Sequence, residues 1–325
     1  MERKRLLSGM QPTQPRLHLG NLEGALRNWV KLQDEYTMYC CIVDWHALTS
    51  LGENPAMIGR NCREIAKDYI AAGIDPERSP IFIQSHVKEH AELHLLFSMM
   101  TPLGWLERVP TYKEKRQLHT AEREPYGLLG YPVLQAADIL LYKPYGVPVG
   151  KDQAPHLELS REIGRRFNNL YGHEVFPEFV NIIGDIPVML GTDGRKMSKS
   201  YDNAIYISDT EDETATKIKN AFTTPTKIKK TDPGVPENCA VCQLLKVYSP
   251  TWQTQWDEDR SGLRGCMQNK KECTEVVNEV LRPMRARRNA LGQDEIEAIL
   301  RSGAERARAF ASQTMVEVRE VMGLR

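Results

Sequence analysis

The sequence lacks both a net charge and a long apolar run. Lysine plus arginine and aspartate plus glutamate number 43 each among 325 residues. A nucleic-acid partner would therefore have to be held by local basic patches rather than by the field of the whole molecule. No stretch approaches the roughly 20 apolar residues of a membrane span, and no apolar run of signal-peptide length follows a basic start. These absences predict a cytoplasmic globular protein with no membrane partner.

Cysteine is also scarce, and its odd count of seven argues against a disulfide framework. Cys40, Cys41 and Cys62 lie in apolar or helical surroundings, which is typical of small buried side chains. The other four cysteines lie together late in the chain and are considered below.

Short β-rich runs alternate with amphipathic helical stretches in the first half of the chain. The expected strands are residues 5–8, 37–43, 81–84 and 145–149, and the expected helices are residues 21–34, 55–72, 89–100, 133–142 and 153–166. This alternation predicts an α/β fold, a Rossmann-like doubly wound parallel sheet with ligands at the carboxyl ends of its strands. From about Thr210 onward the strand signals stop, which predicts a C-terminal all-helical domain.

The segment between the first expected strand and helix reads Gly9-Met-Gln-Pro-Thr-Gln-Pro-Arg-Leu-His18-Leu-Gly20-Asn21. A loop leading into a helix presents backbone N–H groups and the positive end of a helix dipole, which suit phosphate. His18 can donate to a phosphate oxygen, and Gly20 lets a nucleotide approach the backbone. Because a turn with one His and one Gly is common, an ordinary turn is an equal alternative for this segment alone.

A second signature, Lys196-Met-Ser-Lys-Ser200, follows Gly191-Thr-Asp-Gly-Arg. Two lysines three residues apart, with interleaved serine hydroxyls, can neutralise a triphosphate and stabilise the charge that develops on it in a transition state. A lysine-rich surface loop is the alternative, but the five-residue string is rare by chance. The two signatures together predict a paired ATP site.

The two signatures resemble those of class I aminoacyl-tRNA synthetases, and nearly the whole chain is similar to the bacterial tryptophanyl-tRNA synthetase family. Supporting stretches are CIVDWHALT at 41–49, FIQS at 82–85, LER at 106–108, YKEK at 112–115, YPVLQAADILLY at 131–142, VPVGKDQ at 147–153 and LRP at 281–283. The resemblance implies a ligase that activates L-tryptophan with ATP and Mg²⁺ and then loads tRNA(Trp) at its 3′-terminal adenosine. It also implies a homodimer.

The same resemblance implies the domain boundaries. Residues 1–205 would form the Rossmann-fold catalytic domain, joined by a C-terminal helix at 298–325, and residues 206–297 would form a helical tRNA anticodon-binding domain. A tyrosine-specific relative, a small nucleotidyltransferase and a catalytically silent paralogue are the alternatives.

Site residues follow from the resemblance position by position. Lys196, Lys199 and His18 match catalytic positions. The positions that contact ATP in the family correspond here to Gln11, Pro12, Thr13, Gly20, Asn21, Gly150, Lys151, Asp152, Val188, Lys196, Met197, Ser198, Lys199 and Ser200. Asp138 matches the acceptor for the indole N–H, a donor that needs a buried partner among apolar walls. An ordinary helix charge is the alternative for Asp138. Tyr131 and Gln153 match contacts to the amino acid's ammonium group.

The first signature departs from the family pattern. The segment Gln14-Pro15-Arg16-Leu17 replaces a Gly-containing run and adds one residue. Either the loop bulges locally and still binds ATP, or ATP binding is weakened, and the intact second signature favours the bulge. Lys151 is a second departure, because an acidic residue is common at that position.

The late cysteines form Cys239-x-x-Cys242, followed by Cys266 and Cys273. Four thiolates in this pattern could hold a [4Fe–4S] cluster or zinc, and four unrelated small apolar side chains are the alternative. Some family members carry such a cluster, and their pattern resembles this one at three positions. The fourth ligand would fall at Val276, which cannot coordinate, so Cys242 would have to replace it.

Two basic stretches lie in the helical part, one formed by Lys227, Lys229 and Lys230 and the other by Arg282, Arg285, Arg287 and Arg288. Solvated charge is the usual interpretation of such runs, and contact with tRNA phosphate is the functional one. Trp252 and Trp256 could stack on unpaired bases, although we expect them to fill the helical core.

Overall fold

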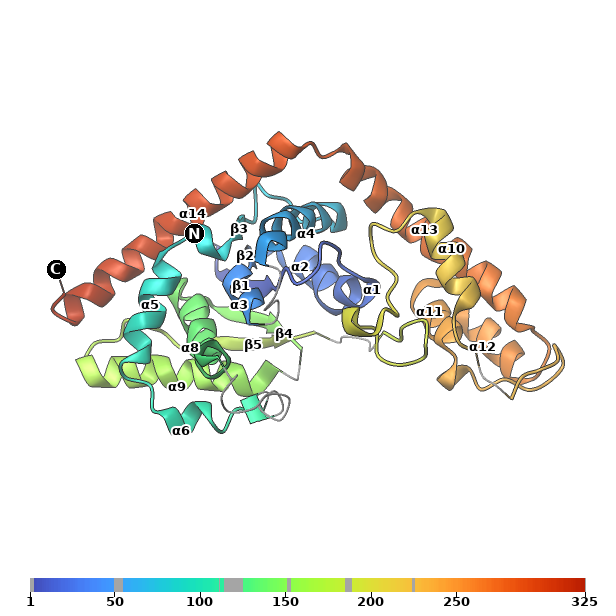
Figure 1. Cartoon of the computed structure of the whole chain (residues 1–325), viewed down its shortest axis with the longest axis horizontal. Coiled ribbons are helices and arrows are strands. Elements are labelled where there is room, and N and C mark those ends of the chain that lie inside the picture. The colour runs from blue at the N-terminus through green and yellow to red at the C-terminus, as the bar shows by residue number, and fades with distance from the viewer. Residues whose placement is uncertain are drawn as a thin grey trace.

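The computed structural model describes residues 3–49, 55–110, 112–113, 125–150, 153–184, 189–223 and 226–324. Its centre is a five-stranded, all-parallel sheet in the order β3-β2-β1-β4-β5 (Figure 1). The strands are β1 Arg5–Met10, β2 Thr37–Ile42, β3 Ile81–Ile83, β4 Gly146–Val149 and β5 Val180–Ile183. The strand order reverses between β1 and β4, and ligands of such sheets bind at this switch point.

Helices connect and follow the strands. They are α1 Leu19–Asn21, α2 Arg27–Leu32, α3 Asp44–Leu48, α4 Ile58–Ala72, α5 Glu89–Ser98, α6 Leu103–Leu106, α8 Tyr126–Leu141, α9 Ala154–Tyr171, α10 Glu211–Asn220, α11 Ala240–Tyr248, α12 Trp252–Arg260, α13 Cys266–Ala290 and α14 Gln293–Val321. A π-helical turn, η1 Leu22–Leu26, joins α1 to α2, and short 3-10 turns are η2 Pro55–Met57, η3 Gln84–His86, η6 Lys199–Tyr201 and η7 Pro236–Asn238.

Alternate residues of each central strand point to opposite faces of the sheet. Leu6 and Cys40 pack with α2 and α4 in one apolar cluster. Leu7 and Cys41 pack with α5, α8, α9 and α14 in the other. Both faces are therefore covered, which confirms the predicted doubly wound α/β class.

Every strand expected from the sequence is present within a few residues, but β5 was not expected. Its four residues, Val180 to Ile183, form the edge of the sheet and are half-buried or exposed. A strand this short, without an alternating pattern, is not distinguishable from a loop by sequence.

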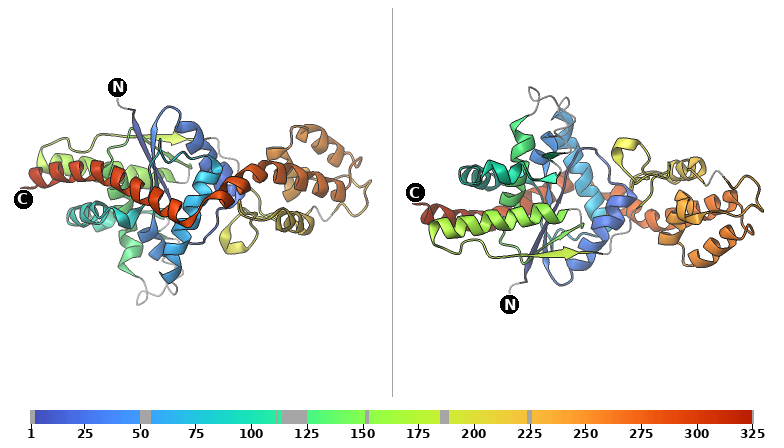
Figure 2. Two further views of the ribbon diagram at one scale, coloured as in Figure 1. Left: turned by 90° about the horizontal axis from the view of Figure 1, so that it is seen from above. Right: turned by 90° about the horizontal axis from the view of Figure 1, so that it is seen from below.

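Helices α10 to α13 lie apart from the sheet, and α14 returns along the sheet domain (Figure 1 and Figure 2). This arrangement confirms the predicted C-terminal all-helical part. The long helices α13 and α14 meet at an angle above α4 (Figure 1). None of the helices in the described ranges is both long and apolar enough to cross a membrane.

Candidate functional site

The first signature is the loop between β1 and α1. His18 caps α1: its ring Nδ1 accepts from the Asn21 N–H at 3.2 Å, and the Asn21 side chain accepts from the His18 N–H at 3.1 Å. A side chain at Gly20 would come within 2.9 Å of the His18 ring. Because Nδ1 accepts a hydrogen bond, the neutral ring carries its proton on Nε2, which makes that nitrogen a donor.

The altered segment of this loop is packed rather than loose. Arg16 pairs with Asp209 at 3.2 Å and lies over the Tyr206 ring, and the Tyr206 hydroxyl donates to Gln14 Oε1 at 3.3 Å. The Leu17 carbonyl accepts from the Ile207 N–H at 2.9 Å. The loop that precedes His18 is thus attached to the segment that follows the second signature.

The second signature is a tight loop organised by Asn203, which is buried. Asn203 Oδ1 accepts from the Ser198 N–H at 2.9 Å, and its Nδ2 donates to Asp193 Oδ1 at 2.7 Å and to the Lys196 carbonyl at 3.2 Å. A Cβ at Gly191 would lie 2.3 Å from the Asn203 side chain, so this close approach requires glycine. Sequence reasoning missed Asn203, because only the folded loop shows what it contacts.

The two signatures face each other across one cavity of about 580 Å³. Of the predicted ATP and catalytic residues, the following line it: Gln11, Thr13, His18, Asn21, Lys196, Met197, Ser198, Lys199 and Ser200. Pro12 lies in the same loop, where its carbonyl accepts from Asn61 Nδ2 at 2.9 Å. The sequence-predicted phosphate residues therefore come together at the carboxyl end of β1.

Electrostatics at this cavity depend on burial. Desolvation lowers the pKa of Lys199 to about 8, although the nearby Asp68 carboxylate acts in the opposite direction. Desolvation, with a smaller contribution from Lys199, lowers the pKa of His18 to about 4. At neutral pH, Lys199 is thus mostly charged, whereas His18 is neutral and can donate only through Nε2.

The remaining predicted ATP residues lie after β4 and before the second signature. Gly150 directly follows β4, and its carbonyl accepts from the Gln153 N–H at 3.0 Å. Lys151, Asp152 and Val188 lie outside the described residues.

A second cavity, of about 320 Å³, opens at the switch point of the sheet. Tyr131, Asp138 and Gln153, the three residues predicted for tryptophan, all line it. Gln11 lines this cavity and the phosphate cavity, so the two adjoin.

Asp138 has three hydrogen-bonding partners at this second cavity. Its Oδ2 lies 2.8 Å from His46 Nε2, its Oδ1 lies 2.7 Å from His90 Nδ1, and Gln84 Nε2 donates to both oxygens at 2.8 and 2.9 Å. Burial raises the pKa of Asp138, but the hydrogen bonds from the two histidines outweigh it, so the pKa lies below its ordinary value. Asp138 is therefore an anion held among apolar walls, not a solvated helix charge.

Sequence reasoning missed the three partners of Asp138. His46 is on α3, Gln84 begins a 3-10 turn after β3, and His90 is on α5. His90 also places Nε2 2.8 Å from the Tyr142 hydroxyl. Their only sequence signal was that His46 and Gln84 lie within the stretches at 41–49 and 82–85 that resemble the family.

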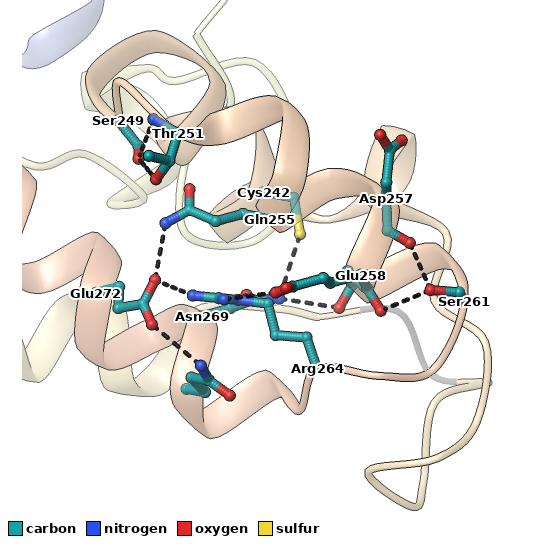
Figure 3. Close-up of polar contacts among 12 residues, drawn as sticks. Cys242, Ser249, Thr251, Gln255, Asp257, Glu258, Ser261, Arg264, Asn269 and Glu272 are labelled. Carbon is teal, nitrogen blue, oxygen red and sulfur yellow. Dashed lines mark hydrogen bonds and ion pairs between the residues drawn. The ribbon is translucent and has the colours of Figure 1, made fainter.

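The four late cysteines lie at the start of α11, within it and in α13. In the part of the chain that the structure describes, no three His, Cys, Asp or Glu side chains converge as metal ligands. Cys242 Sγ accepts from Asn269 Nδ2 at 3.7 Å, and Asn269 belongs to a polar network with Arg264 (Figure 3). The Cys239 thiol also neighbours Cys242, and the hydrogen bond between the two side chains lowers the pKa of Cys239 to about 7. The structure therefore lends no support to a [4Fe–4S] cluster or zinc at Cys239, Cys242, Cys266 and Cys273, which stays a prediction.

The basic stretches of the helical part are mostly engaged inside the protein. Arg282 pairs with Glu211, Arg285 donates to Asn278 and Thr214, Arg287 donates to the Ala71 carbonyl, and Arg288 pairs with Asp68 and Glu64. Lys227 is buried against Asp259. Lys229 and Lys230 are exposed. Trp252 and Trp256 are half-buried and pack edge to face against each other.

Comparison with known proteins gives consistent results. The family described as tRNA synthetases class I (W and Y) matches residues 1–282. Tryptophan–tRNA ligase of Thermotoga maritima is 45% identical, over 98% of this chain and 99% of its own length, and that of Aquifex aeolicus is 41% identical, over 98% and 100%. A structure of tryptophanyl-tRNA synthetase from Campylobacter jejuni with ADP and tryptophan is 35% identical, with a TM-score of 0.87 over 98% of this chain and all of that one.

Proposed function

Since the chain belongs to the class I tRNA synthetases for tryptophan and tyrosine, we propose that it activates L-tryptophan with ATP and transfers it to the 3′-terminal adenosine of tRNA(Trp). The observation that carries this proposal is the pair of adjoining cavities. One is lined by the lysines of the second signature and the other by the buried Asp138 anion, and Gln11 borders both.

In the first step, an oxygen of the tryptophan carboxylate attacks the α-phosphorus of ATP. The bond from that phosphorus to the bridging oxygen breaks, and pyrophosphate leaves with the bonding electrons. Lys196 and Lys199 neutralise the charge that develops on the leaving group, and His18 donates from Nε2 to a phosphate oxygen. No side-chain nucleophile is required.

In the second step, a hydroxyl of the terminal adenosine of tRNA attacks the carbonyl carbon of the adenylate. The acyl–phosphate bond breaks, and AMP leaves. Tryptophan would be held throughout by Asp138 at the indole N–H and by Tyr131 and Gln153, whose neutral oxygens suit the ammonium group.

For the nucleotide, we propose that Gln11, Pro12, Thr13, Gly20 and Asn21 contact ATP together with residues 196–200. Contact with the adenosine part of ATP stays a prediction for Gly150, Lys151, Asp152 and Val188. The described lining of the phosphate cavity contains no carboxylate, so Mg²⁺ would enter with ATP and add positive charge at its phosphates. A [4Fe–4S] cluster at the late cysteines stays a prediction, and iron and sulfide analysis of anaerobically purified protein tests it. Protein free of iron and sulfide would contradict it.

For tRNA, we propose that residues 206–297 form the anticodon-binding domain, alongside the catalytic residues 1–205 and the joining helix 298–325. Lys229 and Lys230 remain exposed there and suit phosphate contacts. Replacing both by glutamate should raise the KM for tRNA while amino-acid activation stays unchanged. Lys31→Glu, at an exposed lysine of α2, is the charge control. An equal effect of the control would contradict the assignment.

For assembly, we propose a homodimer formed through the side chains of α5, α6 and the start of α8. Large apolar side chains are exposed on or beside these helices, at Leu95, Met99, Leu103 and Tyr126, and exposed apolar surface is a feature of interaction sites. Met99→Glu should convert the dimer to a monomer in sedimentation analysis. A wild-type chain that is monomeric at micromolar concentration would overturn the proposal. The cytoplasmic location stays a prediction.

The experiment that tests the proposed activity is amino-acid-dependent ATP–pyrophosphate exchange, run in parallel with tryptophan and tyrosine. We expect exchange with tryptophan and little with tyrosine, because the indole N–H is only a donor and Asp138 only an acceptor. Exchange with neither amino acid would overturn the proposal. Preference for tyrosine would reject the assigned specificity.

A further inference from the structure

A fully buried carboxylate on α4, Asp68, lies beneath the first signature. Its Oδ2 accepts from the Leu17 N–H at 2.8 Å, and its Oδ1 accepts from Arg288 Nε at 2.6 Å. Leu17 directly precedes His18 and ends the segment at which the sequence departs from its family. One carboxylate therefore connects the altered phosphate loop to an arginine of α13.

Arg288 is well suited to fix this carboxylate. Its side chain is 12% exposed, and Arg288 also donates from Nη2 to Glu64 Oε2 at 2.5 Å. A guanidinium stays charged at all relevant pH values and donates in a fixed fork. Arg288 thus holds two carboxylates of α4 one turn apart and compensates the cost of burying Asp68.

The backbone at residues 17–19 is held from two sides. The Leu17 carbonyl and the Leu19 N–H bond to Ile207 and Ile205 at 2.9 Å each, in the segment that follows the second signature. Asp68 holds the Leu17 N–H from the opposite element, α4. The position of His18 over the phosphate cavity therefore depends on contacts from both sides.

Asp68 also influences the second signature electrostatically. Its charge raises the pKa of Lys199, against the larger effect of desolvation. Burial raises the pKa of Asp68 itself to about 6, and the Arg288 charge and hydrogen bond oppose that rise. Arg288 thus favours the anionic form of Asp68, which in turn favours charged Lys199.

We propose that Arg288 and Asp68 are positioning residues for nucleotide binding, through which α13 of the helical domain fixes the altered first-signature loop and supports Lys199. The inference rests on the proposed function, because it concerns the ATP site of that reaction. It explains how a loop with an extra residue and without the family glycine keeps a defined shape. It also connects the helical domain to the phosphate site through Asp68.

The same helix offers a matched control. Arg287 Nε and Nη2 donate to the Ala71 carbonyl at 3.0 and 2.6 Å, so Arg287 also connects α13 to α4. These hydrogen bonds involve neither Asp68 nor the signature loop. Loss of Arg287 removes a comparable connection between the two helices without changing the carboxylate beneath Leu17.

The experiment compares Arg288→Ala with Arg287→Ala in ATP–pyrophosphate exchange, with the melting temperature recorded for each. We expect Arg288→Ala to lower kcat/KM for ATP on the order of tenfold to a hundredfold, as misplaced binding groups do, while the KM for tryptophan changes less than about twofold. Arg287→Ala should lower the melting temperature comparably and leave kcat/KM for ATP close to wild type. Arg288→Lys should recover part of the loss.

Two results would overturn the inference. One is equal kinetic effects of Arg287→Ala and Arg288→Ala, and the other is an Arg288→Ala loss shared equally between ATP and tryptophan. If Arg288→Ala does not fold, Asp68→Asn carries the test, because it keeps the shape and an acceptor for Leu17 but loses the charge. Equilibrium binding of ATP to the same variants separates this inference from the proposed function. A wild-type chain without exchange would reject the function, whereas ATP affinity insensitive to Arg288 and Asp68 would reject the inference.

Discussion

His46 Nε2 lies 2.8 Å from Asp138 Oδ2, at the wall of the cavity proposed for tryptophan. The two oxygens of a carboxylate offer about four acceptor positions, and His46, His90 and the doubly donating Gln84 use four. Gln84 and His90 are fully buried, whereas His46 lines the cavity. An incoming indole N–H would therefore replace His46 at Oδ2, so the free site keeps Asp138 ionised with an internal donor that the substrate can exchange.

The first prediction concerns Asp138→Asn. We expect tryptophan affinity to fall about tenfold to a hundredfold, because a hydrogen bond to a charged group contributes roughly 1.5–3 kcal/mol. The KM for ATP should change little. Pre-steady-state adenylate formation and equilibrium binding give the two quantities separately.

A tryptophan analogue with sulfur in place of the indole N–H provides the control. Wild-type protein should reject this analogue, and Asp138→Asn should discriminate much less against it. Unchanged discrimination in the variant would show that Asp138 does not recognise the indole N–H.

The sequence was sufficient for β1 to β4 because these strands are mostly buried apolar runs that alternate with helices of clear periodicity. It was not sufficient for β5, whose four residues have no such pattern. It predicted the π-helical turn at Leu22–Leu26 only as part of one continuous helix, because local periodicity does not resolve a single widened turn.

The candidate site also contains residues that the sequence was sufficient to predict and residues that it was not. Lys196, Lys199 and His18 lie in contiguous signatures, so their residue types and spacing were enough to predict a phosphate site. His46, Gln84 and His90 come from three elements and meet only at Asp138. The late cysteines are an intermediate case, because Cys239 and Cys242 are neighbours as their spacing predicts, while no three side chains of the described residues converge as metal ligands.

The second prediction concerns the pH dependence of ATP use. The pKa of Lys199 is lowered to about 8 from 10.5, so the free protein loses this charge as the pH rises through about 8. We expect kcat/KM for ATP, which reports groups of the free enzyme, to decline above that pH. His18 and Asp68 are the charged or titratable groups coupled to Lys199.

Lys199→Arg is the matched variant for this profile, because arginine stays charged. Its alkaline decline should move to higher pH, whatever its absolute rate. An alkaline limb that is the same in both proteins would assign the titration to another group. The effect on stability has the opposite sign: between about pH 8 and 10.5 the unfolded chain binds the Lys199 proton more tightly, so stability rises with pH there.

The third prediction concerns Asn203, which holds the second signature. Asn203→Ala removes hydrogen bonds to Ser198, Asp193 and Lys196, each contributing on the order of 1 kcal/mol. We expect the KM for ATP to rise about tenfold or more while tryptophan binding is retained. Isothermal titration with each substrate measures both effects. Parallel losses for both substrates would indicate a general folding defect instead.

The last prediction concerns the packing of α14 against the sheet. A Cβ at Gly303 would lie 2.0 Å from the Ile81 carbonyl oxygen on β3, so Gly303→Ala must push the helix away from the strand. Overpacking of this kind costs about 1–3 kcal/mol, and we expect a lower melting temperature and a lower denaturant midpoint. Gly292→Ala is the control, because its φ is −74° and no atom lies within 4 Å of its added Cβ. Equal stability of the two variants would mean that α14 does not pack against β3 in solution.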